Sequence, residues 1–318
     1  MRYRPLGTSG LLVSVVGLGC NNFGRRLDVN GTRAVVDAAI DAGITLLDTA
    51  DIYGGHGASE SLLGEVLGRR RDQVVLATKF GHAKTDMGYG PAAGAKGGRA
   101  YIKRAVTESL RRLRTDYIDL YQIHTPDPVT PIDETIAALD ELVTDGKVRY
   151  VGHSNFPGWQ LAHAEHVARE LGRTRFISAQ NHWSLLERDA EAEVVPAARQ
   201  FGLGLLPYYP LANGLLTGKV RRGQDVPGGI RLAGRPGYIT EQKLDRVEAL
   251  IAWAEAQGAG ILDVAIGGLA SIPGCASVIA GAMSPEQVKA NAVAGDWIPS
   301  AGQRADLDAI VPPPEADF

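Results

Sequence analysis

The chain of 318 residues has little cysteine, little net charge and no long hydrophobic run. Its two cysteines, Cys20 and Cys275, cannot form a disulfide framework, which favours a reducing, cytoplasmic environment. The formal net charge of −3 argues against nucleic acid or an anionic membrane surface as a partner. No apolar run approaches the ~20 residues that cross a bilayer. We therefore expect a cytoplasmic protein with no nucleic-acid or membrane partner.

Metal ligands and domain boundaries are also missing. The seven histidines show no paired spacing with cysteine or glutamate, so no metal site is predicted. An apolar share of 45% is usual for a globular chain with a full core. No linker or low-complexity tract divides the sequence, so residues 1–318 are expected to form a single domain. The sequence carries no signal for the oligomeric state.

The chain is organised around residues 44–54, ITLLDTADIYG. Residues 44–47 are too few for a helix and are predicted to form a strand buried on both faces. This strand ends at Asp48, and Tyr53 follows in the loop beyond it. The arrangement recurs twice, because residues 74–78 end in Lys79 and residues 118–123 end in His124. Three buried strands are thus each expected to end in a titratable side chain.

Strands of this kind alternate with helical stretches along the chain. The expected strands are residues 15–19, 44–47, 74–78, 118–123, 148–152, 176–179, 203–206 and 277–280. Eight βα units with apolar strands predict an α/β fold, a (β/α)8 TIM barrel. Residues 2–14 predict an N-terminal β-hairpin around Gly7–Gly10. The polar tail from Pro299 is expected to lie over the surface.

Two glycine-rich connections, Gly81–Gly98 and Leu211–Gly237, are expected to be long βα loops on the C-terminal face of the barrel. In a parallel barrel the strands all end at this face, and active sites form there. The polar strand-end residues are Asp48, Lys79, His124, Ser154, Asn155, Gln180 and Tyr208. Their common placement predicts a site at the C-terminal end of the barrel.

Asp48, Tyr53, Lys79 and His124 together predict proton donation to a carbonyl oxygen. An ammonium near Tyr53 is expected to lower the pKa of the phenol from about 10. A buried Lys79 needs a counter-ion, which Asp48 can supply. His124 can hydrogen-bond beside the substrate oxygen. Without a metal, the hydride for such a reduction must come from an organic cofactor.

The remaining strand-end residues favour a nicotinamide ring. Ser154, Asn155 and Gln180 offer donors and acceptors for a carboxamide, and Tyr208 offers a flat ring for stacking. Three aromatic residues, Phe23, Tyr89 and Trp183, are candidate walls of the substrate pocket. Such walls favour an apolar or ring-bearing carbonyl compound, although sugars also stack on aromatic rings.

A second chemistry uses the same lysine. A barrel lyase could form a Schiff base with its substrate through Lys79. A lysine next to a carboxylate keeps its charge, however, which disfavours this alternative.

The sequence resembles the aldo-keto reductase family along nearly its whole length. The matching stretches are LLDTADIYG at residues 46–54, ATKFG at 77–81, DLYQIHTPD at 119–127, GHSNF at 152–156, Gln180, LLPYYPLANGLLTGK at 205–219 and SPEQVKAN at 284–291. The resemblance implies a (β/α)8 barrel that reduces aldehydes or ketones with NADPH. It implies Tyr53 as general acid, Lys79 and Asp48 as the pair that tunes it, and His124 as the residue that orients the carbonyl.

The resemblance also implies the cofactor contacts. Ser154, Asn155 and Gln180 match carboxamide binders and Tyr208 the stacking ring, whereas Leu211, Gly214 and Leu216 match the pyrophosphate segment and Asn291 the adenine contact. The resemblance alone implies NADP(H) as cofactor. Many members have arginine where this chain has Gln287, so the preference for NADP(H) is expected to be weak, with NAD(H) as a workable substitute. Some relatives are non-catalytic NADP-binding subunits that sense redox state, and this remains an alternative function.

Overall fold

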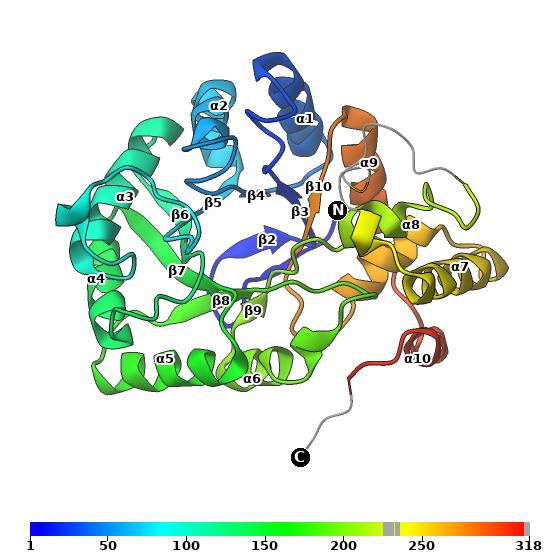
Figure 1. Ribbon diagram of the computed structural model, residues 1–318. Helices are drawn as coiled ribbons and strands as arrows, with labels where there is room; N and C mark the ends of the chain where they lie inside the picture. Colours follow the sequence, from blue (N-terminus) through cyan, green and yellow to red (C-terminus); the bar gives the residue numbers. More distant parts are fainter. Residues whose placement is uncertain (225–231, 233–235, 315–318) are drawn as a thin grey trace.

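The computed structural model describes residues 1–224, 232 and 236–314 (Figure 1). Within these residues, eight parallel strands form one sheet in the order β10-β3-β4-β5-β6-β7-β8-β9. The strands are β3 (Val16–Gly19), β4 (Leu46–Asp48), β5 (Val75–Phe80), β6 (Ile118–Ile123), β7 (Val148–Ser154), β8 (Phe176–Gln180), β9 (Gly204–Leu205) and β10 (Val278–Gly281). Parallel bridges from Leu205 to Cys275 and from Tyr208 to Ile279 connect the two edges of the sheet.

Helices alternate with these strands and surround the sheet (Figure 1). They are α1 (Val29–Asp41), α2 (Ala58–Leu67), α3 (Arg99–Leu113), α4 (Ile132–Thr144), α5 (Gly158–Glu170), α6 (Val194–Phe201), α7 (Glu241–Ala256), α8 (Ile261–Asp263), α9 (Pro285–Ala294) and α10 (Ala301–Ile310). This arrangement confirms the predicted α/β architecture and is that of a (β/α)8 fold. Part of the predicted connection Leu211–Gly237 lies outside the described residues.

The predicted N-terminal hairpin is present and closes one end of the barrel. Its strands β1 (Tyr3–Pro5) and β2 (Leu12–Ser14) pair antiparallel, with Arg4 opposite Val13. Leu6 and Val13 are fully buried, and they form one cluster with side chains from the barrel strands, including Leu46 and Leu120. The hairpin therefore fills the end at which the strands begin, and leaves the opposite end for a ligand.

The C-terminal segment contains a helix that the sequence analysis did not predict. Much of the polar tail from Pro299 forms α10, whose residues are mostly exposed or half-buried. Ser300 and Gln303 make a reciprocal capping box at its start, and Leu307 is buried on its inner face. The apolar face of this helix is too short to give a clear helical pattern among the surrounding polar residues of the sequence. The Ser-x-x-Gln spacing at its start is nevertheless a known helix-start signal.

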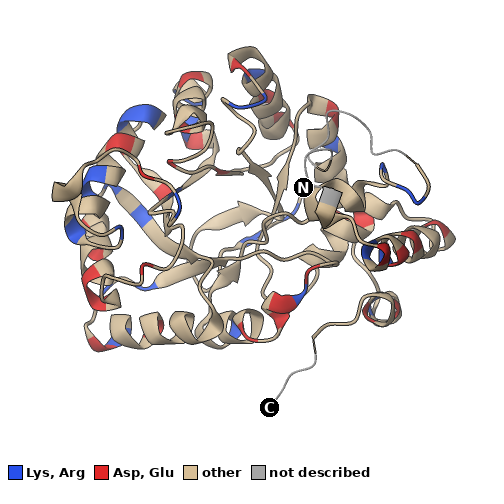
Figure 2. Cartoon of the chain, viewed as in Figure 1, with Lys and Arg blue, Asp and Glu red and all other residues tan. Residues whose placement is uncertain are grey.

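Charged residues are concentrated on the outer helices, and the barrel strands carry few of them (Figure 2). Among the described residues, no single helix is both long and apolar enough to cross a membrane. Only α7 taken together with residues 261–268 reaches that length and composition, across a bend of 111°.

A histidine lies in the hydrophobic core between the barrel and its helices. The His153 ring stacks on Phe156 at 4.6 Å between centroids and contacts the edge of Phe176. Neither ring nitrogen has a hydrogen-bond partner among the described residues. Burial lowers the pKa of His153 to about 3, so the ring is neutral in the folded protein.

This lowered pKa predicts a loss of stability in mild acid. Below about pH 6.5 the unfolded chain binds a proton at His153 that the folded chain does not, so the free energy of unfolding falls with pH by up to about 1.4 kcal/mol per unit. His153→Phe, which suits the aromatic cluster, should flatten this slope between pH 6.5 and 5 in urea-unfolding measurements. The exposed His163 provides the control, because His163→Gln should leave the slope unchanged. Equal slopes in wild type and His153→Phe would contradict the prediction.

Candidate active site

The loop after β4 carries Tyr53 towards the centre of the barrel. The Tyr53 N–H donates to the Ala50 carbonyl at 3.1 Å, and the Ser59 N–H donates to the Tyr53 carbonyl at 3.1 Å. Gly54 follows with a φ of +73°, and a Cβ at this position would lie 2.6 Å from the Phe23 carbonyl oxygen. Only glycine fits this close left-handed turn without strain. The turn therefore fixes the position of Tyr53 in the loop that follows β4.

Lys79 is fully buried and forms an ion pair with Asp48. Its Nζ donates to Asp48 Oδ2 at 2.7 Å and to the Thr49 carbonyl at 2.9 Å. The same Nζ lies 5.1 Å from the centroid of the Tyr53 ring. Burial disfavours the ammonium, but Asp48 and the Tyr53 hydroxyl outweigh it and raise the pKa of Lys79. The lysine is therefore charged at neutral pH.

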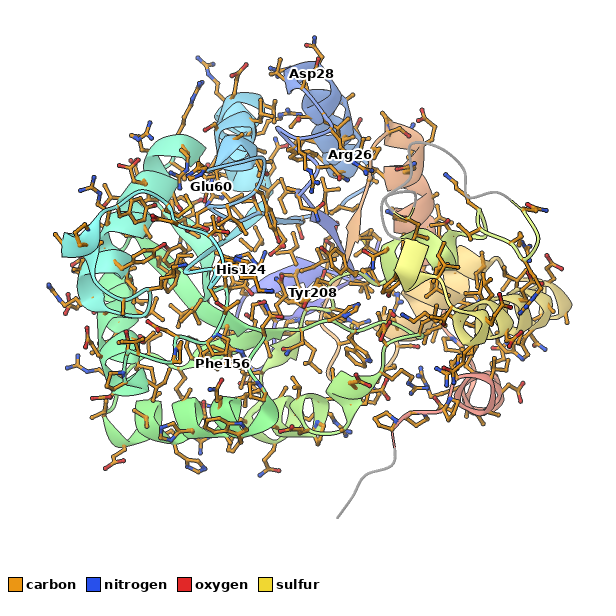
Figure 3. All side chains as sticks on the ribbon, viewed as in Figure 1. Arg26, Asp28, Glu60, His124, Phe156 and Tyr208 are labelled. Atoms are coloured by element: carbon orange, nitrogen blue, oxygen red, sulfur yellow. The ribbon has the colours of Figure 1, made fainter. Side chains whose placement is uncertain are left out.

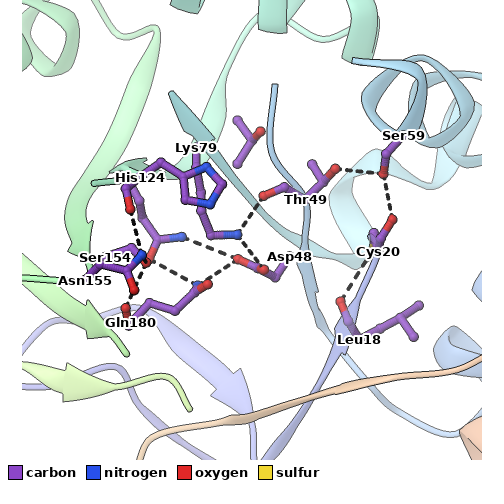
Figure 4. A network of polar contacts seen from close by, with 12 residues as sticks. Leu18, Cys20, Asp48, Thr49, Ser59, Lys79, His124, Ser154, Asn155 and Gln180 are labelled. Atoms are coloured by element: carbon purple, nitrogen blue, oxygen red, sulfur yellow. Dashed lines mark hydrogen bonds and ion pairs between the residues drawn. The ribbon is translucent and has the colours of Figure 1, made fainter. Parts of the chain in front are cut away.

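Two glutamine amides hold the other oxygen of the carboxylate, and Figure 4 shows the contact between Gln180 and Asp48. Gln180 Nε2 donates to Asp48 Oδ1 at 2.9 Å, and Gln122 Nε2 approaches the same oxygen at 3.4 Å. Gln122 was not among the predicted site residues. Its signal was available, since it is a polar residue in the apolar run of β6, two residues before His124. Gln180 therefore supports Asp48 through its amide nitrogen.

The pKa of Tyr53 differs from the expectation. Burial raises it to about 12, against the opposing effect of the Lys79 ammonium. The sequence predicted a lowered pKa because it shows the lysine but not the degree of burial of the phenol. Desolvation is the larger effect here, so the Tyr53 hydroxyl is fully protonated at neutral pH.

His124 lies beside Tyr53 in the same space. The two rings are 6.0 Å apart between centroids and nearly perpendicular, at 83°. His124 Nδ1 is buried and has no hydrogen-bond partner among the described residues. Burial, together with the charges of Lys79 and His82, holds the pKa of His124 well below its usual value. The imidazole is therefore neutral, as suits a hydrogen-bonding group rather than a cation.

Ser154, Asn155 and Tyr208 form a connected chain of hydrogen bonds. Ser154 Oγ donates to the Gln180 carbonyl at 2.8 Å, and Asn155 Nδ2 donates to the His124 carbonyl at 2.9 Å. The Tyr208 hydroxyl donates to Asn155 Oδ1 at 2.8 Å. Asn155 has a φ of +62°, a backbone conformation that asparagine tolerates better than most residues. These side chains are fixed in place across β7, β8 and the segment after β9.

A cavity of about 1010 Å³ opens at this end of the barrel. His124 and Tyr208 lie near the centre of the ring of helices (Figure 3). The cavity brings together most of the predicted site residues: Asp48, Tyr53, His124, Ser154, Asn155, Gln180, Tyr208, Leu211, Gly214, Gln287 and Asn291. Lys79 is not part of the lining and is joined to the site by its buried ion pair with Asp48. No group of three metal-ligating side chains occurs in the described part of the chain.

Besides Lys79, four predicted residues lie outside the lining that the described residues form. Phe23 and Leu216 are fully buried in hydrophobic clusters. Trp183 is also buried, with its indole N–H donating to Glu191 Oε1 at 2.8 Å. Tyr89 packs against Tyr101 at 5.2 Å between ring centroids. The aromatic type of these residues was visible in the sequence, but the direction of their side chains was not.

The lining includes residues that the sequence did not single out. His82 and Thr125 lie beside His124, and Arg26 and Lys219 add two cations. His82 and Thr125 each follow a predicted strand end by a few residues, which was a usable signal. Tyr209, noted only as a departure from the family pattern, also lines the cavity.

The far end of the cavity is formed by the first turns of α9. Ser284 caps this helix, and Gln287 Oε1 accepts a hydrogen bond from the Met283 N–H at 2.8 Å. The Glu286 side chain lines the cavity next to Gln287. A helix N-terminus favours anions, but a carboxylate in its first turn opposes that preference.

The comparisons with known proteins agree with this architecture. The family model "Aldo/keto reductase family" matches residues 15–311. The chain is 39% identical to "Uncharacterized oxidoreductase YrpG" of Bacillus subtilis (strain 168), over 91% of this chain and 89% of the relative. It is 33% identical to "Aldo-keto reductase YhdN" of the same organism, over 98% of this chain and 94% of the relative. It is also 35% identical to "Probable voltage-gated potassium channel subunit beta" of Oryza sativa subsp. japonica, over 94% of this chain and 92% of the relative.

The chain therefore belongs to the aldo/keto reductase family. Membership makes it an oxidoreductase of a family that acts on small-molecule carbonyl compounds with nicotinamide cofactors.

One buried carboxylate near the site was not predicted. Asp51 is fully buried, and neither of its oxygens has a hydrogen-bond partner among the described residues. Burial and the nearby Glu60 carboxylate raise the pKa of Asp51 to about 8, against the opposing charges of Arg112 and Lys79. The backbone N–H of Asp51 donates to the Lys79 carbonyl at 3.0 Å, so the residue anchors the loop that carries Tyr53.

The raised pKa predicts that stability falls as pH rises. Between about pH 4 and 8 the folded chain keeps a proton on Asp51 that the unfolded chain has lost, so this contribution to stability is lost as pH rises through that range. Asp51→Asn, which resembles the protonated form, should therefore raise the melting temperature at pH 8.5 more than at pH 5. Asp41→Asn, at an exposed position on α1, is the matched control. An equal effect of Asp51→Asn at both pH values would show that the carboxyl is ionised throughout.

Proposed function

We propose that the protein reduces an aldehyde or ketone to an alcohol, reversibly, with NADP(H) as hydride donor and Tyr53 as proton donor. The observation that carries this proposal is the meeting of Tyr53, His124 and the Lys79–Asp48 pair at one end of a single large cavity. The other end of that cavity reaches α9. One elongated ligand could therefore extend from the reacting groups to the helix N-terminus.

The residues present fit a nicotinamide cofactor. Asn155 uses both amide hydrogens and one oxygen lone pair in the protein, which keeps its amide plane fixed. Its remaining lone pair and Gln180 Oε1 are acceptors that suit a carboxamide N–H. Tyr208 stacks on His182 at 5.4 Å and 9°, so its ring is held in one orientation. Leu211 and Gly214 line the path between this end and α9.

Four side chains would carry the chemistry. When bound, the nicotinamide supplies the hydride that adds to the carbonyl carbon. Tyr53, protonated at neutral pH, donates its hydroxyl proton to the carbonyl oxygen, so that the C=O bond becomes a C–OH bond. The Lys79 ammonium stabilises the phenolate that is left, and Asp48 holds the ammonium in place. Neutral His124 donates a hydrogen bond to the carbonyl oxygen and polarises it.

The alternatives have less support. A Schiff-base lyase needs an uncharged lysine, whereas the pKa of Lys79 is raised. The likeness to a protein named as a potassium channel subunit is the one observation that favours a non-catalytic redox-sensing subunit. The complete set of Asp48, Tyr53, Lys79 and His124 around one cavity supports catalysis instead.

The first test of the proposal removes the proton donor. Tyr53→Phe deletes one hydroxyl and should lower kcat by a factor on the order of 10² or more, the scale of general acid catalysis. Cofactor affinity, measured by fluorescence titration, should change little because the phenol serves the carbonyl group. Tyr150→Phe is the matched control, since Tyr150 packs at the hairpin end of the barrel. Near-normal turnover by Tyr53→Phe in a chemistry-limited assay would remove Tyr53 from this role.

The second test concerns the cofactor phosphate. Gln287 stands where many family members have arginine, and the carboxylate of Glu286 beside it in the first turn of α9 would repel a 2′-phosphate bound there. Wild type should therefore discriminate only weakly between NADPH and NADH. Gln287→Arg should tighten NADPH more than NADH, because a guanidinium makes charge-assisted hydrogen bonds to phosphate worth roughly 1.5–3 kcal/mol each.

The matched control for this test is Gln287→Met. It loses the same bond to the Met283 N–H without adding charge, so it should affect both cofactors alike. Dissociation constants of both cofactors are measured on all three proteins. A wild-type preference for NADPH above about 10³-fold, or roughly 4 kcal/mol, would mean that another cation reaches the phosphate.

A further inference from the structure

The cavity wall beside His124 differs from the one that the sequence predicted. The aromatic residues Phe23, Tyr89 and Trp183 are directed elsewhere among the described residues, and His82 lies at this end instead. Its ring centroid is 4.8 Å from that of His124, at an interplanar angle of 72°. Two imidazoles therefore face the space in which a carbonyl group would meet Tyr53.

The segment that carries His82 is held rigidly. Lys96 Nζ donates to three carbonyl oxygens of this segment: those of His82 at 2.5 Å, Ala83 at 2.9 Å and Thr85 at 2.8 Å. Thr125 Oγ1 donates to the Gly81 carbonyl at 3.0 Å and accepts from the Ala83 N–H at 2.9 Å. All three ammonium hydrogens and the threonine hydroxyl are thus used to fix one short stretch of backbone. Such preorganisation is expected of a residue that contacts a ligand.

The ring has one nitrogen engaged within the protein and one that is not. His82 Nδ1 is paired with Thr85 Oγ1 at 3.3 Å, and the residue lines the cavity, so Nε2 is the ring nitrogen that could serve a ligand there. Burial and the charges of Lys96 and Lys84 lower the pKa of His82. The ring is therefore neutral, and Nε2 is a donor or an acceptor according to the tautomer that Thr85 selects.

We propose that the natural substrate is a carbonyl compound with a hydroxyl group on the carbon next to the carbonyl, and that His82 recognises this hydroxyl. This inference rests on the proposed carbonyl reduction and specifies its substrate class. A hydroxyl suits either tautomer, because it can donate to Nε2 or accept from it. A purely apolar substituent would desolvate Nε2 without replacing its hydrogen bond, which is unfavourable.

The distance between the two histidines agrees with an adjacent hydroxyl. A carbonyl oxygen bonded to His124 lies about 3 Å from that ring nitrogen. A carbon–carbon bond adds about 1.5 Å, so a hydroxyl on the neighbouring carbon falls between the carbonyl position and the His82 ring.

The test compares two substrates that differ in one hydroxyl. Three-carbon aldehydes with and without a hydroxyl at carbon 2 are reduced by wild type, His82→Phe and His82→Gln, with NADPH oxidation as readout. Wild type should favour the hydroxylated aldehyde in kcat/KM by roughly tenfold, the size expected for one hydrogen bond. His82→Phe, similar in shape, should lose this preference mainly through a higher KM for the hydroxylated aldehyde. His82→Gln, whose amide can reach the position of Nε2, should restore part of it.

The outcomes separate the two proposals. If wild type reduces neither aldehyde nor any other carbonyl compound, the proposed function fails. If wild type reduces both aldehydes equally well, or prefers the aldehyde without the hydroxyl, only the inference about the hydroxyl is overturned. An equal loss on both aldehydes in His82→Phe would likewise overturn it, since that result indicates a general structural role. Isothermal titration of NADPH to each variant checks that the cofactor end is unaffected.

Discussion

The buried ion pair between Lys79 and Asp48 is the interaction on which the rest of this structure depends. A lone ammonium in the centre of a barrel would be costly by several kcal/mol, and removal of one partner from a buried pair typically costs about 3–5 kcal/mol. The pair joins β4 to β5, and Gln180 and Gln122 tie the carboxylate to β8 and β6. Four strands must therefore stand in one register for the charges to be satisfied. A slip of one residue in β5 would turn Lys79 out of the barrel.

The residue before Lys79 in β5 shows the same principle on the opposite face. Thr78 points outward, where its hydroxyl donates to Glu60 Oε1 at 2.6 Å. Arg112 Nε donates to Glu60 Oε2 at 2.6 Å, and both charged groups are buried. Buried charges thus lie on both sides of β5, one set inside the barrel and one between the barrel and α2 and α3. The strand that positions Lys79 is consequently fixed from both faces, which suits a group whose position matters for chemistry.

The sequence predicted the fold and the strand-end residues well because both follow from simple periodicity. Short apolar runs ending in a polar residue give the strand, its burial and the end at which the side chain emerges. Side-chain direction in loops does not follow from such patterns. Phe23 and Trp183 are bulky and near the site in sequence, yet tertiary packing turns them into the core. His82 was overlooked because a histidine in a glycine-rich loop carries no periodic signal, and only its place shortly after the Lys79 strand end pointed to the site. Its direction depends on Lys96 and Thr125, which hold the backbone of this segment.

The pKa of Tyr53 shows a second limit of reasoning from residue types alone. Lysine and tyrosine side by side suggest an acidic phenol, but the same enclosure that brings them together also removes water from the phenolate. Burial is the larger effect, so the proton stays on the hydroxyl until a carbonyl oxygen begins to take it. The Lys79 charge then acts where it is most useful, on the phenolate that forms during the transfer. A donor that is protonated at rest and stabilised after donation needs the ammonium to be permanent. This requirement explains why so much of the barrel interior is used to keep Lys79 charged.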